Sequence, residues 1–171
     1  RRRARGSSEY EYARSGDYPI ERILKTALLV DGGIDAMPKL IERLTDEDGA
    51  VRYWAATGLA NLGGAAVSAA PALRARLRDQ SPDVRIAVAQ ALCRIGRTEV
   101  GLPPLIEELK HNDPWLRLAA ANAIDYVGEK AGSAVPAMRS FMAGDDRENL
   151  FVRWIFGNTL RTLNIAPKTR K

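Results

Sequence analysis

The sequence predicts an all-α fold, an α-solenoid of four helical hairpins preceded by one capping helix. Its main regularity is a set of arginines that recur about every 33 residues, a period typical of helical repeat proteins. They are Arg52, Arg85, Arg117 and Arg153. A residue that favours a helix N-cap precedes each arginine by four positions, and glycine or asparagine follows each by eleven. Prolines upstream of the arginines mark a further series of helices, so the repeated unit is a helix–turn–helix hairpin.

The capping helix is expected within residues 17–33. Asp17 is suited to cap it and Pro19 to occupy its first position, while Gly32 and Gly33 end it. Its apolar residues recur at helical spacing and form one face: Ile20, Ile23, Leu24, Ala27 and Leu28. This helix is expected to cover the open end of the stack. Residues 1–16 lack such periodicity and are expected to be extended or mobile.

The second helix of each hairpin begins and ends with the same two signals in every repeat. Its expected N-caps carry side-chain oxygens that accept hydrogen bonds from the first turn: Asp48, Ser81, Asp113 and Asn149. Its expected ends are residues that tolerate a left-handed backbone: Gly63, Gly96, Gly128 and Asn164. Small residues beside its apolar stripe let neighbouring helices approach closely: Gly58, Ala91, Ala123 and Thr159.

The first helix of each hairpin is expected to begin at a proline, which is Pro38, Pro71, Pro103 or Pro136. Apolar residues follow each proline at helical spacing. The turns within the hairpins are too short for anything but antiparallel neighbours. The solenoid is therefore expected to occupy residues 34–165, and residues 166–171 form a basic tail.

The charge distribution argues against a surface that binds duplex nucleic acid, which is the second hypothesis for this fold. The net charge is +5, but seven basic residues lie in the two terminal segments: Arg1, Arg2, Arg3, Arg5, Lys168, Arg170 and Lys171. Without these seven, the 26 basic residues fall to 19, against 21 acidic ones. A nucleic-acid-binding domain would carry its basic residues on the folded surface. No apolar run is long enough to cross a membrane.

The residues that usually carry chemistry are sparse, and no metal or cofactor is expected. The single histidine, His111, lies in a turn and is expected to be exposed. The single cysteine, Cys93, is expected to be a structural thiol at a partly exposed position, because other repeats place alanine, aspartate and arginine there. Asp145 and Asp146 lie in a turn without a partner base and are expected to cap a helix.

An enzymatic alternative remains open on the same fold. A lyase-like or base-excising enzyme would need an aromatic pocket with a catalytic carboxylate. The residues that would supply such a site are Trp54, Trp115 and Asp125.

The repeated arginines have two interpretations. In a structural ladder, each would pair with an acidic or amide group of the adjacent hairpin, because a guanidinium makes two hydrogen bonds at once. In a functional stripe, Arg52, Arg85, Arg117 and Arg153 would be exposed and bind phosphate or sulfate. Their presence in every repeat, the end repeats included, favours the ladder.

Three segments resemble HEAT repeats of the bacterial type: "DEDGAVRYWAATGLANLG", "SPDVRIAVAQALCRIG" and "NDPWLRLAAANAIDYVG". This resemblance covers about residues 34–165 and implies HEAT-type hairpins. Residues 7–24, "SSEYEYARSGDYPIERIL", resemble the segment that joins the catalytic domain to the C-terminal HEAT repeats of bacterial arylsulfatase-like proteins. The narrower resemblance implies a C-terminal accessory domain of a periplasmic or secreted parent enzyme.

The catalytic residues of that family have no counterpart here. A sulfatase requires a Cys- or Ser-x-Pro-x-Arg motif and a cluster of metal-binding aspartates, and Cys93 has no proline two residues later. If the resemblance holds, the chemistry lies upstream of Arg1. The sequence thus predicts a non-catalytic scaffold or protein-interaction module, with a free-standing adaptor as the alternative to the sulfatase accessory domain.

The partner-binding face is expected on the second helices, on the side opposite the core, which is usually the concave side of a HEAT-type solenoid. The residue after each arginine is large and apolar, and four positions later comes a polar residue, mostly an amide. Apolar anchors beside adjustable hydrogen-bonding groups are typical of an interface. The eight residues are Tyr53, Thr57, Ile86, Gln90, Leu118, Asn122, Trp154 and Asn158. The alternative is partial burial of these side chains against the neighbouring hairpin.

A tyrosine-rich segment before the capping helix is a second candidate interface. Tyr10, Tyr12 and Tyr18 alternate with charged residues. Tyrosine buries its ring while its hydroxyl stays in water. The segment is therefore expected to pack on an adjoining domain, and the alternative is packing on the capping helix.

Overall fold

The computed structural model describes residues 18–144 and 147–165. Several sequence-based expectations concern residues outside these ranges. They are the extended N-terminal segment, the basic tail, Tyr10, Tyr12, Asp145 and Asp146. Within them the regular structure is helical, without a strand, and four antiparallel hairpins follow one leading helix. The prediction of an all-α solenoid is confirmed.

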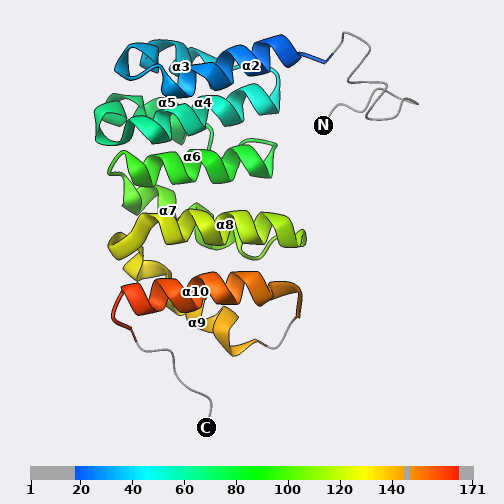
Figure 1. The fold of residues 1–171 in the computed structure, drawn as a ribbon, viewed down its shortest axis with the longest axis vertical. Coiled ribbons are helices and arrows are strands. Elements are labelled where there is room, and N and C mark those ends of the chain that lie inside the picture. Colours follow the sequence, from blue (N-terminus) through cyan, green and yellow to red (C-terminus); the bar gives the residue numbers. More distant parts are fainter. Residues whose placement is uncertain (1–17, 145–146, 166–171) are drawn as a thin grey trace, which may run out of the picture.

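The helices alternate between two layers that run the length of the molecule (Figure 1). One layer contains the leading helix and the second helix of each hairpin: α2 (Ile20–Leu28), α4 (Gly49–Leu62), α6 (Pro82–Arg94), α8 (Pro114–Val127) and α10 (Leu150–Thr162). The other contains the first helices: α3 (Met37–Arg43), α5 (Ala70–Arg74), α7 (Thr98–Glu108) and α9 (Val135–Ala143). Within the first layer each helix packs on the next. Equivalent positions of these helices therefore lie in adjacent helices along the stack.

Short 3-10 segments connect several of these helices. η1 (Leu29–Asp31) follows the leading helix, and η2 (Ile34–Ala36) precedes α3. η3 (Gly63–Ala69) precedes α5, η4 (Gly128–Ala134) precedes α9, and η5 (Arg147–Asn149) precedes α10. Such tight turns are usual at helix ends. They shorten the first helices and leave the longer second helices as the regular element of the repeat.

The helix ends follow the sequence signals closely at their C-termini. All four predicted stops have a positive φ, from +54° at Asn164 to +88° at Gly96. At the N-termini, Asp48 accepts hydrogen bonds from the backbone N–H groups of Ala50 and Val51, and Asp113 accepts one from Trp115. The side chains of Ser81 and Asn149 make no such cap.

One predicted helix start is wrong. Pro38, Pro71 and Pro136 lie in the first two positions of their helices, but α7 begins at Thr98, five residues before Pro103. The turn upstream of Pro103 stays α-helical because Gly101 and Leu102 are buried there against the preceding hairpin. The packing of that turn outweighs the backbone hydrogen bonds that the two prolines inside α7 remove.

The leading helix α2 has the sequence signals of a second helix but carries charged residues at two core positions. Arg22 follows Pro19 by three positions, as in two of the hairpins, and Gly33, eleven positions later, has φ +63°. Two of the positions that are buried and apolar in α4, α6, α8 and α10 hold Glu21 and Lys25 in α2, which form a salt bridge of 2.7 Å. Polar residues at core positions are typical of a terminal capping repeat.

Gly101 is expected to be sensitive to the smallest substitution. A Cβ atom added there would lie 2.3 Å from the carbonyl oxygen of Ala89 and 2.7 Å from the sulfur of Cys93. Because backbone atoms of α6 cannot move aside cheaply, Gly101→Ala is expected to lower the free energy of unfolding by about 1–3 kcal/mol. Urea denaturation measures this. Gly132→Ala is the control, since nothing lies within 4 Å of its added Cβ, and equal losses in both variants would contradict the close α6–α7 crossing.

Candidate partner-binding face

Cys93 is unsuited to act as a nucleophile. It is 6% exposed and belongs to the core, so the expectation of a partly exposed position is wrong. The glycine at position 101 brings α7 onto the helix surface that carries Cys93, and this contact excludes water. Burial, with a smaller contribution from the charge of Glu99, raises the pKa of the Cys93 thiol to about 12. The thiol therefore stays protonated at neutral pH.

His111 has a structural place in the turn between α7 and α8. Its Nδ1 accepts a hydrogen bond of 3.0 Å from the backbone N–H of Asp113, and its carbonyl oxygen accepts one of 2.9 Å from Arg117. The side chain is half-buried rather than exposed, which corrects the sequence-based expectation. Among the described residues, no group of three or more His, Cys, Asp or Glu side chains is arranged to hold a metal ion.

The residues of the enzymatic alternative do not form one pocket. Trp115 and Asp125 are ten residues apart on the same helix, which is about 15 Å along its axis. Trp54 lies on α4, and α6 packs between α4 and α8. The carboxylate of Asp125 accepts a hydrogen bond of 2.6 Å from the hydroxyl of Thr159 on α10, so it joins two hairpins.

Arg52 makes a two-pronged ion pair across the first junction between hairpins. Its Nε and Nη2 donate to the two carboxylate oxygens of Asp79, both at 2.8 Å, and the two side chains are 5% and 3% exposed. Its Nη1 donates to the carbonyl oxygens of Asp46 and Glu47 in its own turn, at 2.8 and 2.9 Å. Arg52 thus holds its own turn and the next hairpin together.

Burial by itself would raise the pKa of Asp79. The hydrogen bonds from Arg52 and from the backbone N–H of Ser81, with the charges of Arg52 and Arg76, outweigh burial and lower the pKa of this carboxyl below its usual 3.8. Asp79 is therefore ionised throughout the physiological range.

The next two junctions repeat this arrangement with different partners. Arg85 donates through Nη1 to the carbonyl oxygen of Asp79 in its own turn and through Nε to the carboxylate of Glu108 on α7. Arg117 donates through Nε to the amide oxygen of Asn149, at 2.8 Å, and through Nη2 to the carboxylate of Glu148, at 3.2 Å. Each of these arginines contacts the hairpin that follows it.

The series also extends to the leading helix. Arg22 of α2 lies 3.5 Å from the carboxylate of Asp46 and 3.2 Å from that of Glu47, both in the first hairpin. At the other end, Arg153 is half-buried and makes no hydrogen bond or ion pair with the part of the chain that the structure describes. The arginines of the solenoid body are thus engaged across each junction, and the last one is not.

The solvent-facing side of the second-helix layer, here called the open face, carries most of the expected partner-binding residues. Tyr53 and Trp154 are exposed, Trp154 at 68%, and Leu118 is half-buried. Ile86 is 5% exposed and is a correction to the predicted row. It lies in the same core cluster as Leu116 and Ala120 of α8, so the neighbouring hairpin covers it.

The polar row lies one helical turn further along the same helices. Asn122 is exposed, and Thr57, Gln90 and Asn158 are half-buried. The hydroxyl of Thr57 donates to the carbonyl oxygen of Tyr53, and the amide oxygen of Asn158 accepts from Arg161. Within the described residues, the side-chain amides of Gln90 and Asn122 make no hydrogen bond, so both are available to a ligand.

Two aromatic residues on the open face were missed. Trp115 and Phe151 occupy the same position of consecutive repeats, three before Leu118 and Trp154, and are 74% and 70% exposed. Residues three and seven positions apart share one face of a helix. The recurrence of a large aromatic two positions before the arginine was visible in the sequence, but its exposure was not.

The tyrosine-rich candidate is only partly within the described residues. Tyr18 is half-buried directly before α2. The other two tyrosines, Tyr10 and Tyr12, precede the described part of the chain.

The chain is similar to known repeat proteins. Residues 37–107 match the family model described as HEAT repeats. A designed armadillo repeat protein, solved in complex with the peptide (KR)4, has a TM-score of 0.60 at 18% identity, over 90% of this chain and 80% of that one. An engineered protein solved as a structural genomics target has a TM-score of 0.56 at 20% identity, over 81% of this chain and 70% of that one. No curated protein matches.

These similarities agree with the geometry. The chain has the fold of HEAT and armadillo repeat scaffolds, in which helical hairpins stack and present one layer to solvent. No helix in the described ranges has both the length and the apolar content needed to cross a membrane.

Proposed function

We propose that this chain is a non-catalytic scaffold that binds a protein partner through the open face. The observation that carries the proposal is the coincidence of exposed aromatic rings with unpaired amides on one layer of helices. Trp115, Phe151 and Trp154 offer rigid apolar anchors, and Gln90 and Asn122 offer hydrogen-bonding groups beside them. Anchors of this kind supply most of the binding energy in protein interfaces.

An extended segment of the partner fits this surface best. The second helices lie parallel in a layer, and stacked helices are about 8–10 Å apart. An extended chain advances about 3.3 Å per residue, so roughly three residues span one junction. The side-chain amides can then pair with the backbone N–H and C=O groups of the segment, which repeat along its length whatever its sequence.

The charge of the open face selects the kind of segment. The aromatic and amide rows occupy three aligned positions of each second helix: two residues before the repeated arginine, one residue after it and five residues after it. At these positions of the described second helices, Asp83 is the one carboxylate. The designed armadillo protein was solved with a strongly basic peptide. At these positions the described second helices have no row of acidic residues for such a ligand, so we expect the chain to prefer segments with large apolar side chains and few cations.

Selection from a random peptide library displayed on phage tests this proposal. A selected peptide is expected to bind Trp154→Ala about 30-fold more weakly than the wild type, the effect of a hot-spot residue worth about 2 kcal/mol. Titration calorimetry measures the difference. Val67→Ala is the matched control, because Val67 is an exposed apolar residue of η3, away from the open face. Failure to select any peptide, or equal affinity for both variants, contradicts the proposal.

We further propose that the chain is the C-terminal accessory domain of a sulfatase-like hydrolase. The support is the resemblance of residues 7–24 to the segment that precedes the HEAT repeats in bacterial arylsulfatase-like proteins. The domain would hold the catalytic domain, a second subunit or a substrate-bearing partner. The reading frame upstream of the codon for Arg1 tests this. A Cys- or Ser-x-Pro-x-Arg motif there supports the parent enzyme, and an unrelated domain or a start codon rejects it while leaving the open-face proposal intact.

A further inference from the structure

The open face repeats one pattern of apolar side chains on two neighbouring helices. Trp115 and Leu118 of α8 occupy the same two positions as Phe151 and Trp154 of α10, and α8 packs on α10. The three aromatic side chains are exposed. A ligand that lies along the stack therefore meets the same kind of surface once per helix, at steps of about 8–10 Å.

This spacing favours one conformation of the ligand. In a β-strand the side chains alternate between two sides, and three residues cover about 10 Å. A strand would therefore turn opposite sides toward successive helices. In the polyproline II conformation, three residues make one turn of about 9.3 Å, so every third side chain returns to the same side. Its period matches the spacing of the helices.

The hydrogen-bonding groups of the open face fit the same ligand. The indole N–H groups of Trp115 and Trp154 can only donate, and neither makes a hydrogen bond within residues 18–144 and 147–165. The side-chain amides of Gln90 and Asn122 supply further donors. Proline has a carbonyl acceptor but no N–H, so a proline-rich segment brings few donors that the aromatic rings would leave unsatisfied.

The charge of this part of the open face is also complementary to such a segment. At the three aligned positions of α8 and α10 that carry the aromatic and amide rows, every side chain is uncharged. The six residues are Trp115, Leu118, Asn122, Phe151, Trp154 and Asn158. A charged segment would lose hydration here without gaining an ion pair, whereas an uncharged segment would not.

We propose that the partner segment is proline-rich and binds across α8 and α10 in the polyproline II conformation. This inference rests on the open-face function proposed above and specifies its ligand. Residues three apart in the segment would pack on the rings of successive helices, and carbonyl oxygens between them would accept hydrogen bonds from Trp115, Trp154 and Asn122. Because a proline-rich segment populates this conformation before it binds, it loses little conformational entropy.

Two synthetic peptides of equal length test the conformation. One contains four Leu-Pro-Pro triplets and the other four Leu-Gly-Gly triplets, so both keep leucine at every third position. The proline peptide is expected to have a Kd about tenfold lower, because the glycine peptide loses more backbone entropy on binding. Titration calorimetry with the full chain measures both. Equal Kd values overturn the proposal, as does absence of binding by the proline peptide at millimolar concentration.

Trp115→Phe tests the hydrogen bond, because it keeps an exposed aromatic ring and removes the indole N–H. It is expected to raise the Kd of the proline peptide about fivefold, the effect of one neutral hydrogen bond. The control is Arg153→Gln at the same end of the stack, which is expected to leave the Kd unchanged.

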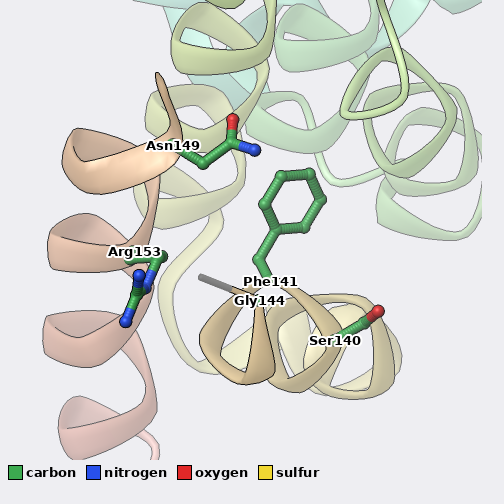
Figure 2. Close-up of a pocket in the computed structure, with 5 residues that line it drawn as sticks. All are labelled: Ser140, Phe141, Gly144, Asn149 and Arg153. Carbon is green, nitrogen blue, oxygen red and sulfur yellow. The ribbon is translucent and has the colours of Figure 1, made fainter. Parts of the chain in front are cut away.

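Arg153 lines a hollow of about 190 Å³ between α9 and α10, apart from the rings of the open face (Figure 2). The other residues that line it are Ser140, Phe141, Gly144 and Asn149. Equal Kd values for the Trp115→Phe and Arg153→Gln chains would mean that the open face does not distinguish itself from this hollow, and would overturn the proposal.

The phage selection separates this inference from the function on which it rests. Selected peptides are expected to carry prolines three residues apart. If they bind through Trp154 but alternate apolar and polar residues with a period of two, the polyproline inference fails and the scaffold function stands. If no peptide of either kind binds, both fail. Self-association of the chain that Trp154→Ala abolishes, measured by sedimentation, would make a second copy the occupant and overturn the proposal.

Discussion

Replacing Arg52 by alanine is expected to lower the free energy of unfolding by about 3–5 kcal/mol, the cost of leaving one partner of a buried ion pair alone. Asp79 would keep its carboxylate in a site that is 3% exposed, without the two hydrogen bonds that now satisfy it. The carbonyl oxygens of Asp46 and Glu47 would lose their donor as well. Chemical denaturation followed by circular dichroism measures the loss.

The control for this prediction is Arg74→Ala, which removes an exposed arginine at the end of α5 and should change stability by no more than about 0.5 kcal/mol. Equal effects of the two substitutions would show that the Arg52 contacts contribute little. The pH dependence provides a second check. Because the pKa of Asp79 is lowered in the folded chain, its stabilising effect is present above about pH 4 and disappears as the pH falls through the folded-state pKa. Arg52→Ala is expected to lose most of this acid-sensitive component.

Replacing Leu92 by alanine is expected to cost about 2–5 kcal/mol, because the side chain is fully buried in a central hairpin and its removal leaves a cavity. Leu163→Ala should cost less. Leu163 is half-buried and lies in the last hairpin, where nothing further along the described chain stacks on it. Denaturation of the two variants under identical conditions measures the difference.

The comparison between Leu92 and Leu163 tests the stacking order directly. In a solenoid each repeat is stabilised by its neighbours, so a central repeat has two interfaces and an end repeat has one. Equal losses at the two positions would contradict the proposed arrangement of the hairpins.

The fold was largely predictable from local chemistry. A glycine or asparagine eleven residues after each arginine adopts the left-handed backbone that ends the helix, and a helix start lies close to each expected N-cap. These signals act within one or two turns of chain, so the sequence contains all that determines them. Pro103 is the exception, because tertiary packing of Gly101 on α6 extends α7 upstream of it.

The candidate site was less predictable because exposure depends on residues far away in the sequence. Ile86 and Trp154 occupy the same repeat position, yet Ile86 is covered by side chains of the next hairpin and Trp154 is not. The acceptors of the arginines show the same limit. Asp79 lies six residues before Arg85, whereas Glu108 lies at the end of α7. No single sequence position supplies the partner, so the pairs emerge only from the stacked structure.

The measurement that tests the central claim most directly is a chemical-shift footprint of a selected peptide on the ¹⁵N-labelled chain. The claim is that the open face of the second-helix layer binds a protein segment. The side-chain amides of Gln90 and Asn122 and the indole N–H of Trp154 are expected to show the largest changes. Changes confined to α3, α5, α7 and α9 would place the interface on the opposite layer and contradict the claim.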